Sequence, residues 1–244
     1  MHLTSRLTHA PAEAASGGAL PEWNLADLYA GMDSPGLSAD LAKAAQDVAA
    51  FAQRYRGNVA ALAGGAQASA ELGKAVEQYE ALQDLLGRLM SYASLLYAGD
   101  TTDPARAKFY GDVQEKVTNA SAQLLFFQLE LNRLDDAVLM KAAESAPLSR
   151  WRPWLEDIRK EKPHELDDKL EELFHEKYIS GAAAWNRLFD ETIASLRFSI
   201  GGQELAIEPA LNFMQDHNEE KRREAAQAVG VTLKANIRTF ALIT

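Results

Sequence analysis

A histidine followed directly by a glutamate, His175-Glu176, is the residue pair in this sequence that comes closest to a metal-binding motif. In the zincin motif, two histidines four residues apart bind zinc from one helix face, and the intervening glutamate acts as a general base. The fourth position after His175 is Ile179, so the second histidine is absent. Because a catalytic zinc takes three protein ligands and keeps one position open, we predict that His175 is a half-buried helix residue and no zinc ligand.

The pattern Glu-x-x-His occurs twice, from Glu161 to His164 and from Glu172 to His175. Di-iron helical bundles bind their metals with two such pairs, which project inward from different helices. Pro163 lies inside the first copy, where it would disrupt a helix interior. The two copies are also only eleven residues apart, which is too close for two long, separate helices. The sequence therefore disfavours a di-carboxylate metal bundle.

The elements that would position these residues are two amphipathic helices in the stretch from residue 166 to 198. Large apolar residues recur in both at helical spacing. They are Leu166, Leu170, Leu173, Phe174 and Tyr178 in the first helix, and Trp185, Leu188, Phe189, Ile193 and Leu196 in the second. A Ser-Gly pair at 180–181 separates the two helices. Asp167 or Asp168 can cap the first helix, and Asp168 has capping-box spacing with Glu171.

Composition limits the classes of protein that this chain can represent. Its 244 residues suffice for one large domain or two small ones, and 47% hydrophobic residues provide for a substantial core. A formal net charge of −10 argues against nucleic acid as a partner and against a polybasic membrane anchor. No apolar run approaches the ~20 residues that a membrane helix needs. The absence of cysteine excludes disulfides and thiolate chemistry, and it fits a reducing compartment.

The N-terminal region consists of a polar leader followed by a segment with large apolar side chains. Residues 1–20 lack the apolar core of a signal peptide, so we interpret them as a disordered leader of a cytoplasmic protein. The large side chains that come next, Trp23, Leu25, Leu28 and Tyr29, are expected to hold the N-terminus against the body of the protein.

The most regular pattern in the chain is a pair of long apolar seams joined by a short bend. The first seam alternates steps of three and four over residues 72–96, and the second follows over residues 109–134. Between them, Asp103 can cap the second helix, with Pro104 at its first position. Two such helices on a short loop predict an antiparallel αα-hairpin, with an arm about 40 Å long at ~1.5 Å per residue.

Shorter elements are predicted around this arm. Helices are expected over residues 37–55, 135–144, 147–160 with a kink at Pro153, 209–214 and 218–244. The first of them starts at the turn Asp33-Ser34-Pro35 and stops near Gly57. The Gly64-Gly65 pair lies in a linker of small residues and lacks the context of a phosphate loop.

One β-hairpin is predicted, with strands over residues 196–200 and 203–207. The Gly201-Gly202 pair between them suits a two-residue primed turn. This register pairs Phe198 with Leu205 and Leu196 with Ile207 on one face, and we expect these four side chains to pack against helices.

The last predicted helix is capped by Asn218 and carries acidic residues in its first turn, which suits the helix dipole. Its apolar stripe consists of Ala225, Val229, Leu233, Ile237 and Phe240. The helix runs to Thr244 without the usual stop signals. We therefore expect the chain to be interrupted inside or just after a helix.

The order of short motifs along residues 21–244 resembles bacterial oligoendopeptidase F, a member of the thimet-oligopeptidase-like zinc metallopeptidases (family M3). The matching pieces are Trp23–Tyr29, the tyrosine-rich segment Leu89–Asp103, Phe126–Leu131, Lys162–Leu166, Glu171–Leu173, Ala184–Glu191 and Arg222–Ala225. The resemblance rests on the ordered set of these pieces and not on any single one.

The resemblance implies a part of a peptidase and not its catalytic centre. Proteins of this family hydrolyse short peptides in a deep channel between helical walls, using zinc bound by an HExxH helix and a further glutamate. This sequence contains no HExxH, so no catalytic, cofactor-binding or metal-binding residue is carried over to it. The implied role is a non-catalytic channel wall, whose partners are an oligopeptide substrate and the chain's own C-terminal catalytic domain. Zinc would be bound in that domain, and this segment alone would be inactive.

The expected architecture is all-α and multi-helical, with a long antiparallel αα-hairpin and one short β-hairpin. After the leader, residues 21–160 form an N-terminal helical lobe with the arm. Residues 161–244 form a helical region with the β-hairpin that leads into a missing catalytic domain. The alternative is a stand-alone interaction module whose arm binds a partner helix. Exposed seam positions would favour that alternative, whereas seams buried within the chain would favour the peptidase.

Overall fold

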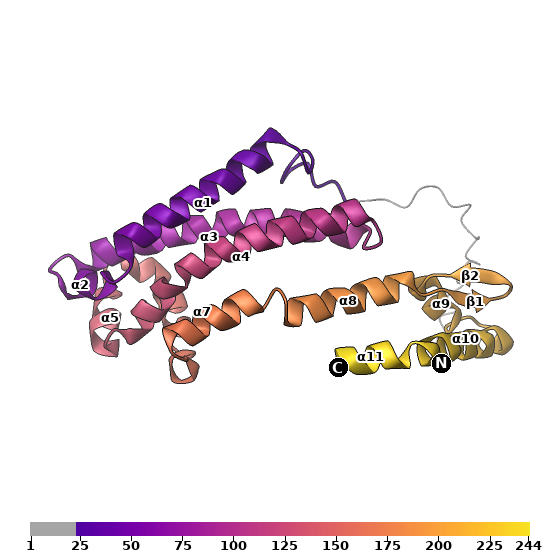
Figure 1. Cartoon of the computed structure of the whole chain (residues 1–244). Coiled ribbons are helices and arrows are strands. Elements are labelled where there is room, and N and C mark those ends of the chain that lie inside the picture. The colour runs from indigo at the N-terminus through magenta and orange to yellow at the C-terminus, as the bar shows by residue number, and fades with distance from the viewer. Residues whose placement is uncertain (1–22) are drawn as a thin grey trace, which may run out of the picture.

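The computed structural model describes residues 23–244, and the leader expected over residues 1–20 lies outside the described residues. The α-helices are α1 (Pro35–Tyr55), α2 (Val59–Gly64), α3 (Ala68–Gly99), α4 (Pro104–Arg133), α5 (Asp136–Ala142), α6 (Arg152–Ile158), α7 (Asp168–Lys177), α8 (Ala182–Ser195), α9 (Ile207–Phe213), α10 (Glu219–Ala235) and α11 (Ile237–Ile243). Short 3-10 helices are η1 (Leu148–Trp151) and η2 (Lys162–His164), and the strands are β1 (Phe198–Ile200) and β2 (Gln203–Leu205). The expected fold class, mostly α with one short β-hairpin, is confirmed (Figure 1).

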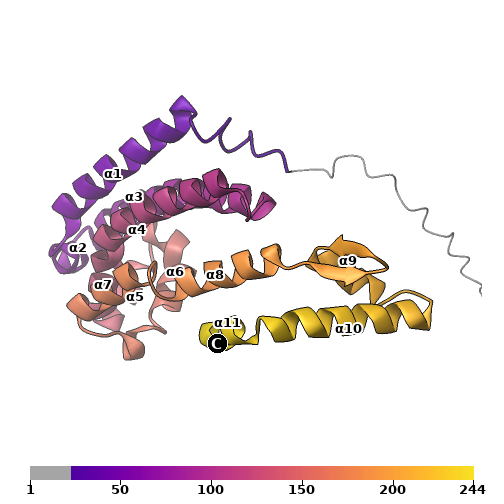
Figure 2. The same cartoon turned by 45° about the vertical axis from the view of Figure 1, so that its right-hand side comes forward.

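The long αα-hairpin is formed by α3 and α4, which lie side by side in both views (Figures 1 and 2). The Asp103 carboxylate caps α4 by accepting a hydrogen bond from the backbone N–H of Ala105 at 2.7 Å. Pro104 occupies the first turn, where a backbone N–H would have no hydrogen-bond partner within the helix, so proline loses nothing by lacking one. The seams are buried within the chain; their most deeply buried members include Leu72, Leu89, Leu124, Phe127 and Leu131.

Helix α1 packs along the hairpin and starts and stops where the sequence predicts. The hydroxyl of Ser34 caps it by accepting a hydrogen bond from the N–H of Leu37 at 3.4 Å. After its last residue, Gly57 adopts a φ of 78°, a conformation that few other residues adopt. The ring of Phe51 lies edge-on to that of Phe127 at 5.1 Å, which ties α1 to α4.

Two expectations for this lobe are wrong. Gly64 does not lie in a linker but ends α2, a helix anchored by the fully buried Val59. Trp23 does not hold the N-terminus, because its side chain is 73% exposed. Residues 25–28 turn back on the hairpin through a hydrogen bond from the N–H of Leu28 to the C=O of Leu25, and Trp23 precedes this turn. The anchor is Tyr29, which is buried as expected.

The stretch from residue 147 to 160 is not one kinked helix. It consists of η1 and α6, and Pro153 lies in the first turn of α6. A proline is favourable there because the first backbone N–H groups of a helix need no partner within it. Pro153 therefore starts a new helix and does not bend an existing one. The short helix predicted before this stretch is confirmed as α5, with the side chain of Asp135 as its cap.

Helices α7 and α8 are separated at the Ser-Gly pair as predicted. A Cβ at Gly181 would lie 2.9 Å from the carbonyl oxygen of Lys177, so only glycine fits this break without a shift of the backbone. Asp167 caps α7 by accepting a hydrogen bond from the N–H of Lys169 at 3.1 Å. The expected capping box with Asp168 does not form, because Glu171 instead accepts a hydrogen bond from the N–H of Leu166.

The β-hairpin has the predicted turn and register. Gly201 and Gly202 both have positive φ angles, of 60° and 76°, as a primed turn requires. Phe198 pairs with Leu205, but the ladder ends there because Ile207 begins α9. The expected pair of Leu196 with Ile207 is therefore wrong. All four apolar side chains nevertheless belong to one core with α9 and α10: Leu196, Phe198, Leu205 and Ile207.

The last predicted helix is divided into α10 and α11. Asn218 caps α10 as expected, accepting a hydrogen bond from the N–H of Glu220 at 2.8 Å. The helix breaks at Asn236, whose side chain donates a hydrogen bond back to the C=O of Thr232. A side-chain bond of this kind competes with the backbone of the helix. The break changes the phase of the apolar stripe, so Ile237 is 63% exposed.

The described residues contain two separate hydrophobic cores. The larger one lies between α1, the hairpin and the elements up to α6, and the smaller one surrounds the β-hairpin. Helices α7 and α8 lie between these cores, and neither has a buried residue (Figure 1). Within residues 23–244, no helix is long and apolar enough to cross a membrane.

Candidate functional site

His175 lies on α7 and is half-buried, as the sequence predicts. Its Nε2 atom is 2.9 Å from the hydroxyl oxygen of Ser121 on α4, so the two side chains share a hydrogen bond. This bond joins α7 to the hairpin. His175 therefore has a structural partner in Ser121.

The two Glu-x-x-His patterns are not brought together as a metal site. His164 closes the 3-10 helix η2, whereas His175 lies within α7. Across residues 23–244, no three histidine, aspartate or glutamate side chains gather into a group that could hold a metal ion. The part of the chain that the structure describes therefore does not fit a catalytic zinc.

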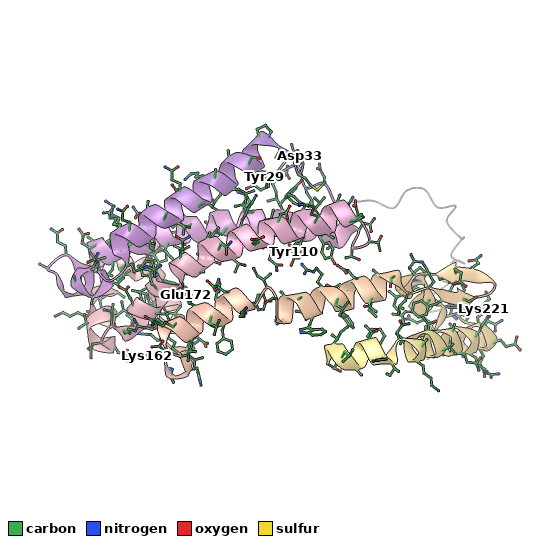
Figure 3. The ribbon with its side chains drawn as sticks, in the orientation of Figure 1. Tyr29, Asp33, Tyr110, Lys162, Glu172 and Lys221 are labelled. Carbon is green, nitrogen blue, oxygen red and sulfur yellow. The ribbon has the colours of Figure 1, made fainter. Side chains whose placement is uncertain are left out.

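A cluster of Tyr97, Tyr110 and Arg187 joins the free end of the hairpin to α8, and we call it the tyrosine–arginine cluster. The rings of Tyr97 on α3 and Tyr110 on α4 stack with centroids 5.0 Å apart and an interplanar angle of 11°. A guanidinium nitrogen of Arg187 lies 4.0 Å from the position that a Cβ would take at Gly111, the residue after Tyr110. Figure 3 shows Tyr110 on the side of α4 that faces α8.

The hydroxyl of Tyr97 is the unusual group in this cluster. It is buried, and it has no hydrogen-bond partner within residues 23–244. The pKa of Tyr97 is raised to about 12, mainly by burial and also by the charges of Glu191 and Asp190, whereas the charge of Arg187 acts to lower it. Tyr97 therefore stays a neutral phenol at physiological pH. Its pKa depends on the charged side chains of α8.

Charged residues on α8 surround the cluster without pairing. Asp190 and Glu191 follow Arg187 by three and four residues, the spacing at which ion pairs form along a helix. Arg187 forms neither an ion pair nor a hydrogen bond with them, since its side chain lies against α4. Both carboxylates are exposed, whereas Arg187 is half-buried.

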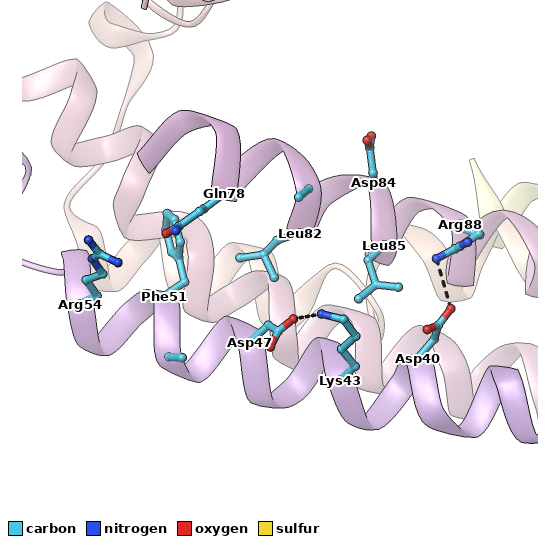
Figure 4. A pocket seen from close by; sticks show the side chains of 12 residues that line it. Asp40, Lys43, Asp47, Phe51, Arg54, Gln78, Leu82, Asp84, Leu85 and Arg88 are labelled. Carbon is cyan, nitrogen blue, oxygen red and sulfur yellow. Dashed lines mark hydrogen bonds and ion pairs between the residues drawn. The ribbon is translucent and has the colours of Figure 1, made fainter. Parts of the chain in front are cut away.

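A groove of about 820 Å³ lies between α1 and α3. Its charged walls are largely satisfied: Asp40 pairs with Arg88 at 3.2 Å, and Lys43 pairs with Asp47 (Figure 4). Tyr29 also donates a hydrogen bond to Asp40 at 2.8 Å. Four of the charged side chains that line the groove therefore already have partners.

An uncovered apolar face extends along α7 and α8, and we call it the α7–α8 apolar face. Its members are all at least 39% exposed: Leu166, Leu170, Leu173, Phe174, Tyr178, Trp185, Leu188 and Phe189. Phe240 of α11 lies 6.2 Å from the ring of Phe189 and covers a small part of it. Large apolar side chains that lie exposed along one segment in this number are uncommon on a folded protein.

The fold defines a mostly helical region in which one face, along α7 and α8, is left exposed. Residues 130–198 match the model of the N-terminal domain of M3 peptidases, a family described as Oligopeptidase F. The matched range runs from the end of α4 through the α7–α8 apolar face to the first residue of β1. It thus supports the resemblance drawn from the order of motifs, to the N-terminal region of an M3 oligoendopeptidase F.

Comparison with solved structures agrees on the fold. The chain is similar to the crystal structure of oligoendopeptidase-F from Enterococcus faecium, with a TM-score of 0.71 over 85% of this chain at 15% identity. It spans only 41% of the length of that protein. A candidate peptidase from Chlamydophila abortus aligns with 91% of this chain and 37% of its own, at 19% identity and a TM-score of 0.45. No curated protein sequence matches the chain.

Sequence reasoning alone did not find the tyrosine–arginine cluster. Its members come from three helices, and Arg187 is 77 positions after Tyr110. Tyr97 and Arg187 lie within segments that carry the family resemblance, Leu89–Asp103 and Ala184–Glu191. That coincidence was the one signal in the sequence that pointed to these residues.

Proposed function

We propose that this chain is the N-terminal, non-catalytic part of a zinc metalloendopeptidase that hydrolyses short oligopeptides, and that it forms a wall of the substrate channel. The observation that carries the proposal is the match of residues 130–198 to the family described as Oligopeptidase F. The fold likeness over 85% of the chain supports it. We place the protein in the cytoplasm as part of the same proposal.

The α7–α8 apolar face supports the second part of the proposal, a catalytic domain as partner. Side chains such as Phe174 and Tyr178 are 63% and 54% exposed, a state that a soluble protein seldom retains over a contiguous surface. A protein of the length of oligoendopeptidase-F has more than half of its chain available to cover such a face. In our proposal the catalytic domain packs on it, and the hairpin borders the channel.

The catalytic chemistry is assigned to that domain, because residues 23–244 offer no group of side chains that fits a catalytic zinc. In this proposal, residues 23–244 contribute a wall of the substrate channel. That wall limits the size of the substrate and carries the charged side chains of α8. The alternative, a stand-alone module whose arm binds a partner helix, is disfavoured because the seams of α3 and α4 are occupied by contacts within the chain.

The proposal is tested with the purified 244-residue chain and with the product of the coding region read beyond codon 244. We expect the chain alone to contain far less than one zinc per molecule by mass spectrometry and to cleave no fluorogenic peptide. The longer product should contain an HExxH sequence and cleave peptides until a chelator removes its metal. Chelator-sensitive peptidase activity that copurifies with the 244 residues would contradict the proposal.

A further inference from the structure

Helix α8 is covered on two opposite sides. A guanidinium nitrogen of Arg187 lies 4.0 Å from the position of a Cβ at Gly111 on α4, so this side of α8 faces the hairpin. Two residues later, the ring of Phe189 contacts that of Phe240 on α11, with centroids 6.2 Å apart. Because two successive steps turn a helix by about 200°, α11 lies on the side of α8 that faces away from the hairpin.

Helix α7 is covered on only one of the corresponding sides. His175 shares a hydrogen bond with Ser121 on α4, which identifies the side of α7 that faces the hairpin. Leu170 and Leu173 precede His175 by five and two residues, so they lie about 140° and 160° away from it around the helix. Both leucines are 46% exposed. Within residues 23–244, the side of α7 that faces away from the hairpin is therefore left open.

Helix α11 points along this open side. Figures 1 and 2 show it beneath α8, running in the opposite direction to α8 and toward α7. A helix in line with α11 would pass over Trp185 and then along α7 as far as Leu166. These two residues are 19 positions apart, which corresponds to about 28 Å of helix.

The exposed surface is large enough for a complete interface. The eight large side chains of the α7–α8 apolar face are 39% to 63% exposed. At roughly 200 Å² for each side chain, they present on the order of 800 Å² to solvent. One partner of a stable protein interface buries about that area. Phe240 reaches only Phe189, so the segment that covers the rest of the face must extend well past α11.

We propose that the helix that follows α11 in the longer protein packs lengthwise on the α7–α8 apolar face, antiparallel to α7; this inference rests on the proposed function. The packing would continue the contact that α11 already makes with α8. A helix suits this surface better than an extended segment does, because the backbone groups of α7 and α8 are already paired within each helix and a helical partner pairs its own. The covering helix should carry apolar residues three and four positions apart over about five turns.

The chain contains no cysteine, so single cysteines can report whether the face is covered. Leu170→Cys and Leu173→Cys place a thiol on the face, and Ala49→Cys places one at an exposed position on α1 as the control. Each variant is labelled with a maleimide in the 244-residue chain and in the product of the coding region read beyond codon 244. We expect both face cysteines to react at least about tenfold more slowly in the longer product, because the packed helix must first open. The control should react equally fast in both, and equal rates at the face would overturn the inference.

A disulfide tests the direction of the covering helix. Phe174 precedes Phe189 by 15 positions, so an antiparallel helix in line with α11 places it opposite a residue about three turns beyond Thr244. Under mild oxidation, a cysteine at that position should cross-link to Phe174→Cys and not to Ala49→Cys. A face pair that stays reduced would contradict the arrangement.

Hydrogen exchange of the unmodified proteins gives a measurement that needs no substitution. The backbone amides of α7 should exchange more slowly in the longer product than in the 244-residue chain, because the covering helix suppresses local opening. Equal exchange of α7 in the two proteins would count against the inference.

The outcome separates this inference from the proposed function. If the longer product is a zinc peptidase but Leu170→Cys and Leu173→Cys remain as reactive as in the 244-residue chain, the covering helix alone is wrong. If these cysteines are protected but the longer product cleaves no peptide, the proposed function is wrong and the covering helix stands.

Discussion

At the scale of single residues, two tyrosines with similarly raised pKa values differ in what their hydroxyl groups do. The pKa values of Tyr29 and Tyr97 are both raised to about 12, in each case mainly by burial. Tyr29 donates a hydrogen bond to Asp40 at 2.8 Å, whereas the hydroxyl of Tyr97 has no partner. Removing a satisfied hydroxyl loses a hydrogen bond, but removing an unsatisfied one relieves a desolvation cost.

We therefore expect Tyr29→Phe to lower the free energy of unfolding by about 1 kcal/mol at neutral pH, the usual net value of a hydrogen bond. Tyr97→Phe should leave it unchanged or raise it. Urea unfolding of the two variants is the measurement. A larger loss for Tyr97→Phe than for Tyr29→Phe would show that the Tyr97 hydroxyl has a partner after all.

The same tyrosine makes a prediction about pH. Because the pKa of this phenol is about 10 in the unfolded chain and about 12 in the folded protein, its titration takes nothing from the stability of the fold below pH 10. That stability is lost as the pH rises from about 10 to about 12, because only the unfolded chain then ionises. Wild type should accordingly lose more stability across this window than Tyr97→Phe does, as measured by urea unfolding at each pH.

At the scale of elements, glycines of α3 differ according to what lies beside them. A Cβ at Gly73 would lie 2.6 Å from Pro147 Cγ and 3.3 Å from the backbone nitrogen of Leu148, so α3 meets η1 there in close contact. A Cβ at Gly87, on the same helix, would meet nothing within 4 Å.

These surroundings predict opposite effects of the same substitution. Gly73→Ala should destabilise the protein by about 1–3 kcal/mol, because the contact with η1 must open. Gly87→Ala should stabilise it by about 0.5–1 kcal/mol, because alanine loses less backbone entropy in a helix. Thermal or urea unfolding of both variants checks the prediction, and a common sign would disprove the close packing of α3 on η1.

Elements also show how far the sequence could predict this structure. The hairpin and the β-turn were predictable because their signals are local: steps of three and four, an Asp-Pro cap at 103–104 and a Gly-Gly pair at 201–202. The break at Asn236 was not predictable, because no glycine or proline marks it in the sequence. It depends instead on one side-chain hydrogen bond. The pairing of Arg187 with Tyr97 and Tyr110 was unpredictable because it depends on how α8 meets the hairpin.

At the scale of the whole molecule, the α7–α8 apolar face governs behaviour in solution. Replacing Leu170 and Phe174 with glutamine should reduce the binding of a hydrophobic dye and any self-association of the chain, without lowering the melting temperature, because both side chains are already exposed. Phe127→Ala, in the fully buried core, should cost about 3–5 kcal/mol instead. Dye fluorescence, sedimentation and calorimetry make the comparison. Strong destabilisation by the surface pair would mean that this face is already packed.

The position of the two cores on either side of α7 and α8 has a mechanical consequence. Since neither helix has a buried residue, tilting one core against the other at the glycine break near residue 181 separates few apolar contacts. The described residues thus have a core at each end and no buried side chain in the two helices between them. We therefore expect that whatever packs on the α7–α8 apolar face sets the angle between the two cores.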